Sequence, residues 1–229
     1  MSRRCCLIAL VLLSSGLPAR AEYAAMADAP ARPNVVLVMC DDLGWGDVGF
    51  NGNRVIATPH LDAMAAAGLR FERFYSAAPV CSPTRGSCLT GRHPYRYGIW
   101  TANAGHLPDE EITLAELLRD AGYATGMFGK WHLGTLTTEV NDSNRGGPRG
   151  AAHFAPPARH GFDVSFVTEA KVPTFDPLRM PQSKPTVKAW DALLPGEPWM
   201  PFGTRYWDER GHEVRDDLAG DDSAIVIDR

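Results

Sequence analysis

The sequence predicts an α/β fold in which a mostly parallel sheet is flanked by helices. Short apolar stretches with the character of strands occur near residues 34–39, 69–75, 123–128 and 163–168. Capped, helix-type segments separate them, and this alternation is typical of a doubly wound sheet. The chain has 229 residues, and residues 34–229 are assigned to a single domain.

The first 21 residues have the features of a secretory signal peptide. Arg3 and Arg4 precede an apolar run at residues 5–13, and Ala19-Arg20-Ala21 provides a small-x-small cleavage site. The run is too short to span a bilayer, so we expect no stable membrane anchor; a buried amphipathic helix is the alternative. Residues 22–33 are rich in Ala and Pro and are expected to form a flexible lead-in.

The charge and cysteine content exclude two classes of protein. The chain has 23 Lys and Arg residues against 27 Asp and Glu residues, and loss of the signal peptide makes it more acidic. We therefore expect no binding to nucleic acid through bulk electrostatics. Cys40, Cys81 and Cys88 follow the signal peptide and are too few for a disulfide framework. Cys40 and Cys88 are expected to be buried free thiols, and a disulfide between them is the alternative.

An acidic pair follows the first predicted strand. Residues 34–40 form a continuous apolar run, typical of a buried parallel strand, which ends at Asp41 and Asp42. Open α/β sheets place their sites at the carboxyl ends of strands. Adjacent carboxylates repel unless a cation or a proton lies between them, and their hard oxygens favour Ca²⁺ or Mg²⁺. A solvated turn is the alternative, and Asp47 in the same stretch is assigned a structural role.

A helix and a strand are predicted before the next motif. Thr58 is a suitable N-cap, Pro59 fits the first helical position, and Gly68 can end the helix. His60, in the first turn, is expected at the surface. Residues 69–75 alternate apolar and charged side chains, which predicts a half-buried strand leading towards Cys81.

The stretch from Pro79 to Arg92 carries the main functional prediction. Pro83 suits the first turn of a helix, which places Cys81 at the helix N-terminus. Unpaired N–H groups there favour an anion, and Arg85 follows one turn later on the same side. This stretch is therefore expected to bind or react with an anion.

A second motif follows a second predicted helix. Thr113 and Glu116 form a capping box. The apolar face is predicted to comprise Leu114, Leu117, Leu118 and Ala121. After the strand at residues 123–128, Lys130 and His132 are two residues apart and point to one side if the strand continues. A cation beside an imidazole suits an anionic substrate and a proton transfer; a solvated strand end is the alternative.

The C-terminal part of the sequence, from residue 137 onward, is rich in residues that favour turns. Residues 137–157 are rich in Gly, Asn and Pro and predict a loop, and residues 171–203 predict an extended segment beside the site. Residues 207–218 predict a hairpin around Glu209-Arg210-Gly211-His212, and Gly220-Asp221-Asp222-Ser223 predicts the start of a helix.

Two of these motifs resemble the signatures of the type I sulfatases. The first is Cys81-x-Pro83-x-Arg85 followed by Leu89-Thr90-Gly91-Arg92, and the second is the stretch at residues 122–132. Cys88 and Phe128 depart from the usual residues; a thiol is small and apolar enough for a core position. In this family the signature cysteine is converted to formylglycine, the catalytic aldehyde. Residues 160–166 also resemble a Gly-Phe-Asp stretch of the family.

The resemblance implies a fold of the alkaline phosphatase type and a set of site residues. Asp41, Asp42 and the modified Cys81 are implied ligands of Ca²⁺, with Mg²⁺ as the alternative. Hydrated formylglycine at position 81 is implied to attack the sulfate sulfur; Arg85 and Lys130 are implied to hold the charge, and His132 to take a proton. The implied partners are a sulfated small molecule or glycan and a formylglycine-generating enzyme. The implied location is secreted or periplasmic, or lysosomal in an animal host.

The resemblance covers roughly residues 33–229, which corresponds to the N-terminal part of a family member. We therefore expect a truncated, incomplete catalytic domain that lacks the later metal ligands and is inactive as it stands. Two alternatives stay open: a phosphonate or phosphate-ester hydrolase of the alkaline phosphatase superfamily, and a non-catalytic secreted fragment that binds sulfated ligands.

Overall fold

The computed structural model describes residues 32–183 and 193–229. The predicted signal peptide and nearly all of the lead-in lie outside these residues. The chain divides into two units, residues 1–40 and residues 41–229. No helix in the described part of the chain is both long and apolar enough to cross a bilayer.

The predicted strand at residues 34–39 is wrong for the described structure. These residues are extended but pair with no strand of the described chain, and Val36 is 84% exposed. A segment becomes a strand only when its edges are hydrogen-bonded to neighbouring strands. Cys40 is an exposed free thiol rather than a buried one. Cys88 is a partly buried free thiol, so the alternative disulfide is not formed.

Residues 41–75 form short helical elements that hydrogen-bond to one another. These elements are η1 (Trp45–Asp47), η2 (Gly49–Asn51) and α2 (Pro59–Ala67). Asp62 in α2 accepts hydrogen bonds from Phe50 N at 2.7 Å and from Thr58 Oγ1 at 3.0 Å. The predicted helix is confirmed, and His60 is exposed as expected.

The predicted strand at residues 69–75 is also wrong. The segment has no strand, and its aromatic residues Phe71 and Phe74 are 70% and 83% exposed. The alternation of apolar and charged residues identified a face that could be buried, but no element of the described chain covers that face.

Three helices follow in the next part of the chain: α3 (Cys81–Thr90), α4 (Pro94–Tyr97) and α5 (Leu114–Asp120). The capping box of Thr113 and Glu116 is present at the start of α5. Of the predicted apolar face, Leu118 is half-buried, whereas Leu114, Leu117 and Ala121 are exposed. The buried residue of α5 is instead Ala115, which the prediction did not include. The backbone of α3 approaches α4 closely at Gly86, where a Cβ would lie 2.8 Å from the ring of Tyr97.

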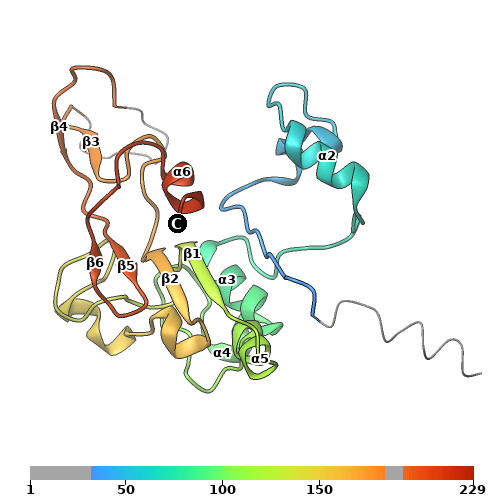
Figure 1. Cartoon of the computed structure of the whole chain (residues 1–229), viewed down its shortest axis with the longest axis horizontal. Coiled ribbons are helices and arrows are strands. Elements are labelled where there is room, and N and C mark those ends of the chain that lie inside the picture. Colours follow the sequence, from blue (N-terminus) through green and yellow to red (C-terminus); the bar gives the residue numbers. More distant parts are fainter. Residues whose placement is uncertain (1–31, 184–192) are drawn as a thin grey trace, which may run out of the picture. The chain divides into compact units, whose positions relative to one another are not determined.

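A four-stranded mixed sheet forms the centre of the second unit (Figure 1). Its strands, in spatial order, are β1 (Gly126–Lys130), β2 (Val164–Thr168), β5 (Tyr206–Asp208) and β6 (Glu213–Val214). β1 and β2 are parallel, with Phe128 opposite Phe166. The other two pairings are antiparallel. The strands expected near residues 123–128 and 163–168 are confirmed, with the first displaced along the chain, and so is the hairpin at residues 207–218.

The two faces of the sheet contribute to two apolar cores. Successive residues of a strand face opposite sides, so Val167 enters one core and Phe166 the other. The first core joins the sheet to α4, α5 and the segment after β1; its buried members are Tyr97, Ile99, Leu107, Ala115, Trp131, Leu133, Leu136, Phe162, Val167 and Trp207. The second core joins the sheet to α6; its buried members are Phe166, Val172, Tyr206, Leu218 and Ile225.

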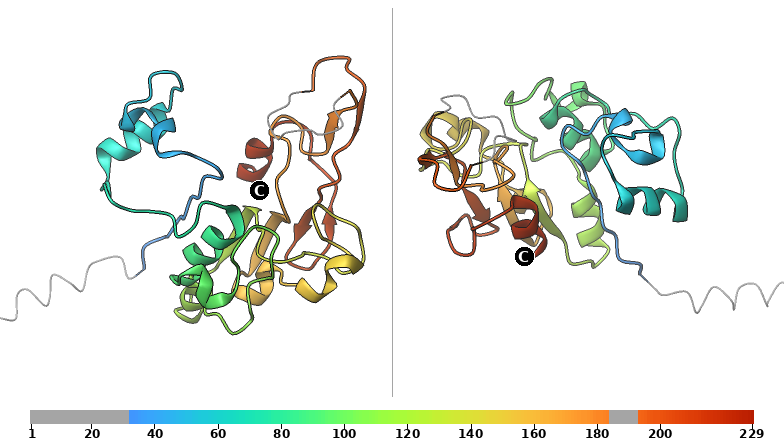
Figure 2. Two further views of the ribbon diagram at one scale, coloured as in Figure 1. Left: turned by 180° about the vertical axis from the view of Figure 1, so that it is seen from behind. Right: turned by 90° about the horizontal axis from the view of Figure 1, so that it is seen from above.

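The remaining elements connect and cover these strands (Figure 2). They are η3 (Pro148–His153), η4 (Pro157–His160), the hairpin of β3 (Arg179–Pro181) and β4 (Trp199–Pro201), and α6 (Asp222–Ile227). Asp221 caps α6 by accepting from the N–H groups of Ser223 and Ala224, which confirms the predicted helix start. The predicted loop at residues 137–157 contains η3, and the predicted extended segment contains the β3–β4 hairpin.

Candidate active site

Cys81 is the first residue of α3, at a helix N-terminus that no side chain caps. The preceding residue, Val80, is extended and has no side-chain acceptor. The N–H groups of the first turn therefore lack a capping side chain, as the sequence predicted for an anion-binding helix start. Pro83 is buried and lies in the first turn of α3. Because a backbone N–H in the first turn has no partner within the helix, the N–H that proline lacks costs the helix no hydrogen bond.

Arg85 and Lys130 converge on Asp41 from different elements. Arg85 Nη2 in α3 donates to Asp41 Oδ1 at 2.8 Å, and Lys130 Nζ at the end of β1 donates to Asp41 Oδ2 at 2.7 Å. Arg85 Nη1 also donates to the carbonyl of Lys130 at 2.6 Å. The two cationic side chains are 10% and 13% exposed, so water screens their charges little. The structure thus brings three of the predicted site residues together.

The two cations determine the charge state of Asp41. Burial by itself would raise the pKa of this carboxyl, but hydrogen bonds and charges from Lys130 and Arg85 hold the pKa below its usual value. Asp41 therefore remains ionised at neutral pH.

Asp42 and Cys81 complete a cluster of potential metal ligands with Asp41. One ligand atom from each of the three residues lies within 4.8 Å of the other two. The Cys81 sulfur stands where the family resemblance would place an oxygen of the modified residue, and two carboxylates beside it suit a hard divalent cation. The arrangement fits part of a Ca²⁺ or Mg²⁺ site, because Ca²⁺ takes about 6 to 8 oxygen ligands. Among the described residues no other group of three such side chains meets these distances.

His132 lies two residues beyond the end of β1 and is 3% exposed. The strand ends at Lys130 and His132 has a φ of 57°, so the premise of a continuing strand is wrong. Its Nε2 lies 2.7 Å from Oδ1 of Asn103. Burial, followed by the charges of Lys130, Arg85 and Arg145, lowers the pKa of His132 to about 3. The ring is therefore neutral at physiological pH and available as a proton acceptor.

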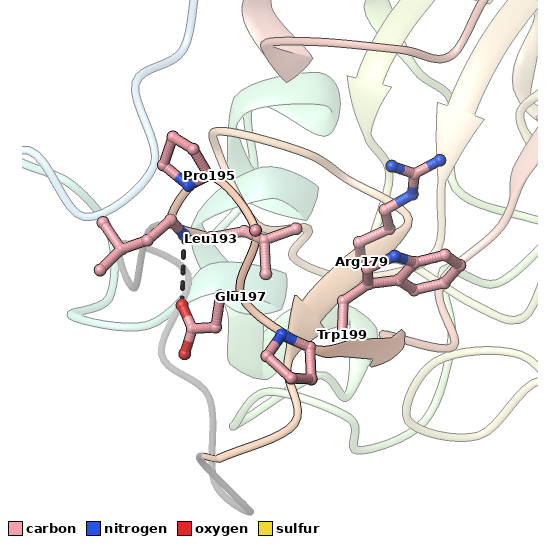
Figure 3. Close-up of a pocket in the computed structure, with 8 residues that line it drawn as sticks. Arg179, Leu193, Pro195, Glu197 and Trp199 are labelled. Atoms are coloured by element: carbon pink, nitrogen blue, oxygen red, sulfur yellow. Dashed lines mark hydrogen bonds between the residues drawn. The ribbon is translucent and has the colours of Figure 1, made fainter.

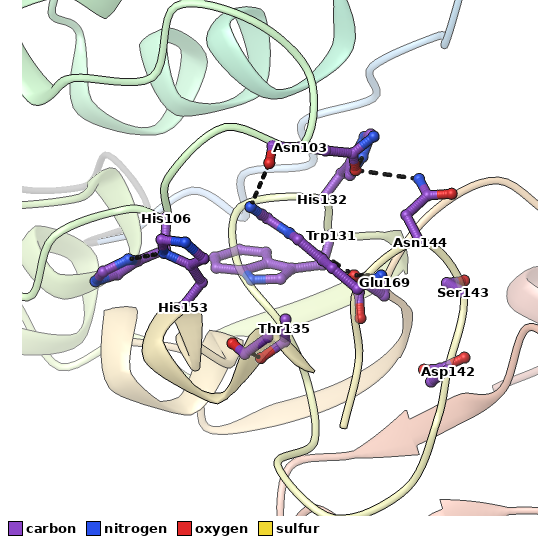
Figure 4. A network of polar contacts seen from close by, with 12 residues as sticks. Asn103, His106, Trp131, His132, Thr135, Asp142, Ser143, Asn144, His153 and Glu169 are labelled. Atoms are coloured by element: carbon purple, nitrogen blue, oxygen red, sulfur yellow. Dashed lines mark hydrogen bonds and ion pairs between the residues drawn. The ribbon is translucent and has the colours of Figure 1, made fainter. Parts of the chain in front are cut away.

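A network of polar residues that no sequence motif indicated lies beside His132 (Figure 4). Asn103 Oδ1 also accepts from Asn144 Nδ2 at 3.1 Å, and its backbone oxygen accepts from Arg145 Nη1 at 2.9 Å. The backbone N–H of Arg145 donates to Oε1 of Glu169 at 3.2 Å. These residues belong to separate loops and to no motif. The one available signal was the tolerance of Asn for left-handed backbone, since Asn103 has a φ of 64°.

Two buried carboxyl groups belong to this region. Glu169 is fully buried, and burial together with the nearby Asp142 raises its pKa to about 7 against the opposing charge of Arg145. Burial also raises the pKa of Asp142, although its oxygens accept from Trp207 Nε1 at 2.7 Å and from Arg205 N at 2.9 Å. These contacts join the loop at residues 141–146 to β5 and to the end of β2.

A surface hollow lies beside the β3–β4 hairpin (Figure 3). The guanidinium of Arg179 lies 4.5 Å from the ring centroid of Trp199, and Glu197 accepts a hydrogen bond from the N–H of Leu194. None of the site residues predicted from the sequence lines it. We therefore assign the chemistry to the region of Cys81 and not to this hollow.

Comparison with known proteins identifies the family. Residues 33–184 match the sulfatase family, and this match covers both signature stretches. The chain therefore belongs to the sulfatase family, as the two motifs indicated.

Curated relatives agree with this assignment. The chain is 44% identical to mouse (Mus musculus) steryl-sulfatase over 154 residues, which is 62% of the chain and 23% of that protein. It is 43% identical to dog (Canis lupus familiaris) N-acetylgalactosamine-6-sulfatase over 169 residues, which is 69% of the chain and 28% of that protein. The chain thus spans about a quarter of the length of these relatives.

A solved structure supports the predicted fold. The structure of BT4656 in complex with its substrate D-glucosamine-2-N,6-O-disulfate matches with a TM-score of 0.54 and 25% identity, over 80% of this chain and 27% of that one. The predicted α/β fold of the alkaline phosphatase type is confirmed by this likeness and by the family match.

Proposed function

We propose that this protein hydrolyses sulfate esters, releasing inorganic sulfate from an aryl or carbohydrate sulfate, with Cys81 converted to formylglycine. The observation that carries the proposal is the convergence of Cys81, Asp41 and Asp42 within 4.8 Å beside two shielded cations. A sulfate group carries negative charge and three oxygens to be held, and this cluster offers positive charge and donors next to the residue at position 81.

Arg85 and Lys130 are proposed to hold the sulfate. Both now donate to Asp41, and both have further N–H groups to offer an anion. Because Asp41 and the carbonyl of Lys130 fix their positions, little reorganisation is required when charge develops on the sulfate oxygens. Their donor groups are charged, which strengthens each hydrogen bond to an anion.

Asp41, Asp42 and the residue at position 81 are proposed to hold a divalent cation, Ca²⁺ with Mg²⁺ as the alternative. When bound, the cation supplies positive charge that polarises a sulfate oxygen, and formylglycine supplies a hydrated aldehyde as the nucleophile. The chain's own acidic pair suits this role because its two negative charges repel without a cation between them.

His132 is proposed to accept a proton during the reaction. Its pKa of about 3 keeps the imidazole neutral, so a nitrogen lone pair is available at neutral pH. The proposed partners are a sulfated small molecule or glycan and a formylglycine-generating enzyme, and the proposed location is secreted or periplasmic.

The first test is the mass of the peptide that contains Cys81, from the full chain made with a formylglycine-generating enzyme. Trypsin separates Cys81, in residues 74–85, from Cys88, in residues 86–92, so the second peptide is an internal control. We expect conversion of Cys81 to the aldehyde and an unchanged thiol at Cys88. A thiol retained at Cys81 in a competent host would contradict the proposal.

The second test measures hydrolysis of an aryl sulfate with Ca²⁺, using the converted chain, Lys130→Ala and Cys88→Ser. Sulfate release by the converted chain would overturn the expectation that it is inactive as it stands. Loss of the Lys130 charge is expected to lower kcat/KM by at least about 100-fold, the scale for removal of one charge-stabilising donor. Cys88→Ser is expected to leave the rate unchanged. Equal rates for the converted chain and the unconverted thiol form would oppose the formylglycine mechanism.

A second candidate function is binding of sulfated ligands without turnover. It is favoured by the size of the ligand set, because the described residues supply three clustered donors whereas Ca²⁺ takes about 6 to 8. Titration calorimetry with an aryl sulfate separates the two functions: Lys130-dependent binding without sulfate release supports this second candidate.

A further inference from the structure

We infer that Asn103 is a positioning residue that fixes His132 in the tautomer protonated at Nε2 and so reserves Nδ1 as the proton acceptor. The inference rests on the proposed role of His132 in sulfate-ester hydrolysis. It concerns a loop residue that belongs to neither signature motif.

The direction of the hydrogen bond follows from the chemistry of the amide oxygen. Asn103 Oδ1 lies 2.7 Å from His132 Nε2 and accepts from Asn144 Nδ2 at 3.1 Å. A carbonyl oxygen has two lone pairs and no hydrogen, so both neighbours must donate to it. A neutral imidazole that donates from Nε2 has its lone pair on Nδ1.

The orientation of Asn103 is itself held by the next loop. Asn103 has a φ of 64°, and its backbone oxygen accepts from Arg145 Nη1 at 2.9 Å. Arg145 also donates to the carbonyl of Gly105 at 2.5 Å and, through its backbone N–H, to Glu169 at 3.2 Å. Arg145 thus fixes the backbone of Asn103. Asn144 fixes its side-chain amide, as Figure 4 shows.

The other ring nitrogen is left free by this arrangement. His132 Nδ1 is buried and has no hydrogen-bond partner within residues 32–183 and 193–229. No group of the described residues uses the lone pair that the Nε2–H tautomer places there. A tautomer with the proton on Nδ1 would instead bury an unpaired donor and set the Nε2 lone pair against the amide oxygen.

The test is ¹⁵N NMR of the imidazole nitrogens in the full chain, labelled at histidine and kept as the unconverted thiol. We expect His132 to show a bare Nδ1 and a protonated Nε2. Asn103→Gly deletes the amide while tolerating the left-handed backbone, and is expected to abolish this single tautomer. Asn103→Asp keeps the acceptor and is expected to retain the proton on Nε2.

A matched control is Asp217→Gly, which replaces an exposed non-glycine residue with a φ of 57° elsewhere in the chain and should leave the His132 signals unchanged. A protonated Nδ1 in the unsubstituted chain, or an unaltered tautomer in Asn103→Gly, would overturn the inference. The spectrum does not depend on formylglycine or on turnover, so failure here is distinct from failure of Cys81 to be converted.

Discussion

Residues 41–75 and residues 95–170 differ in how far their large apolar side chains are buried. In the first region Val55, Phe74 and Tyr75 are 94%, 83% and 81% exposed. In the second region Trp131 and Val167 are completely buried in the first core. The first region contains short helical elements with local contacts, whereas the second contains the parallel strand pair and the second signature stretch, at residues 122–132.

The hydrogen bonds of the two regions differ in the same way. In the first region Phe50 N binds Asp62, twelve residues away. In the second, Thr125 binds Asp163 across 38 residues, and the loop residue Asp142 binds Trp207 across 65. Long-range contacts hold the second region, and the site is arranged on it: Lys130 ends β1 and His132 follows. Asp41 and Asp42 come from the first region, whereas Cys81 and Arg85 lie in α3, between the two regions.

The largest expected effect on the free energy of unfolding comes from comparing one tryptophan of each region. Trp131→Ala removes a fully buried ring and leaves the carbonyl of Ala155, which accepts from its Nε1 at 2.7 Å, without a partner. We expect the free energy of unfolding to fall by roughly 3–5 kcal/mol. Trp45→Ala, at a side chain that is 74% exposed, is expected to change it by less than about 0.5 kcal/mol. Urea unfolding followed by circular dichroism measures both; equal losses would remove the distinction between the regions.

The next largest effect on stability is expected from comparing one glycine of each region. Gly161 has a φ of 89°, and a Cβ there would lie 2.4 Å from the backbone nitrogen of Glu116. Gly161→Ala therefore combines a left-handed backbone with a steric clash, and we expect a loss of roughly 2–4 kcal/mol. Gly52→Ala, with a φ of 98° and open space, should cost only about 1 kcal/mol. Thermal unfolding tests this order, and a larger loss for Gly52→Ala would contradict it.

The pH dependence of stability distinguishes a buried from an exposed glutamate. The pKa of Glu169 is about 7 in the folded chain against 4.5 for an ordinary glutamate, so the folded chain binds the extra proton between these pH values. The free energy of unfolding therefore falls by roughly 3 kcal/mol as the pH rises through this window, and then levels off. Glu169→Gln should remove this fall, whereas Glu72→Gln, 69% exposed, should not. If the urea midpoint changes with pH between 4 and 8 in the same way for all three proteins, the raised pKa assigned to Glu169 is wrong.

The smallest expected effect on the free energy of unfolding tests whether the apolar face predicted for α5 is buried. Leu117 is 58% exposed, so Leu117→Ala is expected to change the free energy of unfolding by less than about 0.5 kcal/mol. Leu133→Ala is the matched control, because this leucine is completely buried and its loss should cost roughly 2–5 kcal/mol. A cost above about 2 kcal/mol for Leu117→Ala would show that the face predicted from the sequence is buried after all.

Local patterns predicted the elements that local chemistry specifies. The capping box at Thr113, the proline in the first turn of α3 and the acidic cap at Asp221 all specify helix starts, and all three helices are present. The two signature motifs predicted the family. Motif residues far apart in the chain, Arg85 and Lys130, meet at Asp41, a contact that the motifs did not specify.

Burial could not be predicted with the same accuracy. The runs at residues 34–39 and 69–75 have the composition of strands, yet both are exposed and unpaired in the described chain. A strand depends on hydrogen bonds to another segment, and its own sequence does not say whether that segment lies beside it. The prediction that Leu117 is buried fails for the same reason, because helical periodicity identifies an apolar face but not the element that covers it.

The sequence by itself determined the family and the helix starts, and it supplied the motif residues that are proposed for the site. Tertiary structure alone placed Asn103 against His132 and buried Glu169 beside Asp142. Those contacts join loops from separate parts of the chain, and their chemistry depends on distance and on exclusion of water. Neither quantity is encoded at any one position, so only the folded chain shows which nitrogen of His132 is held and which is left free.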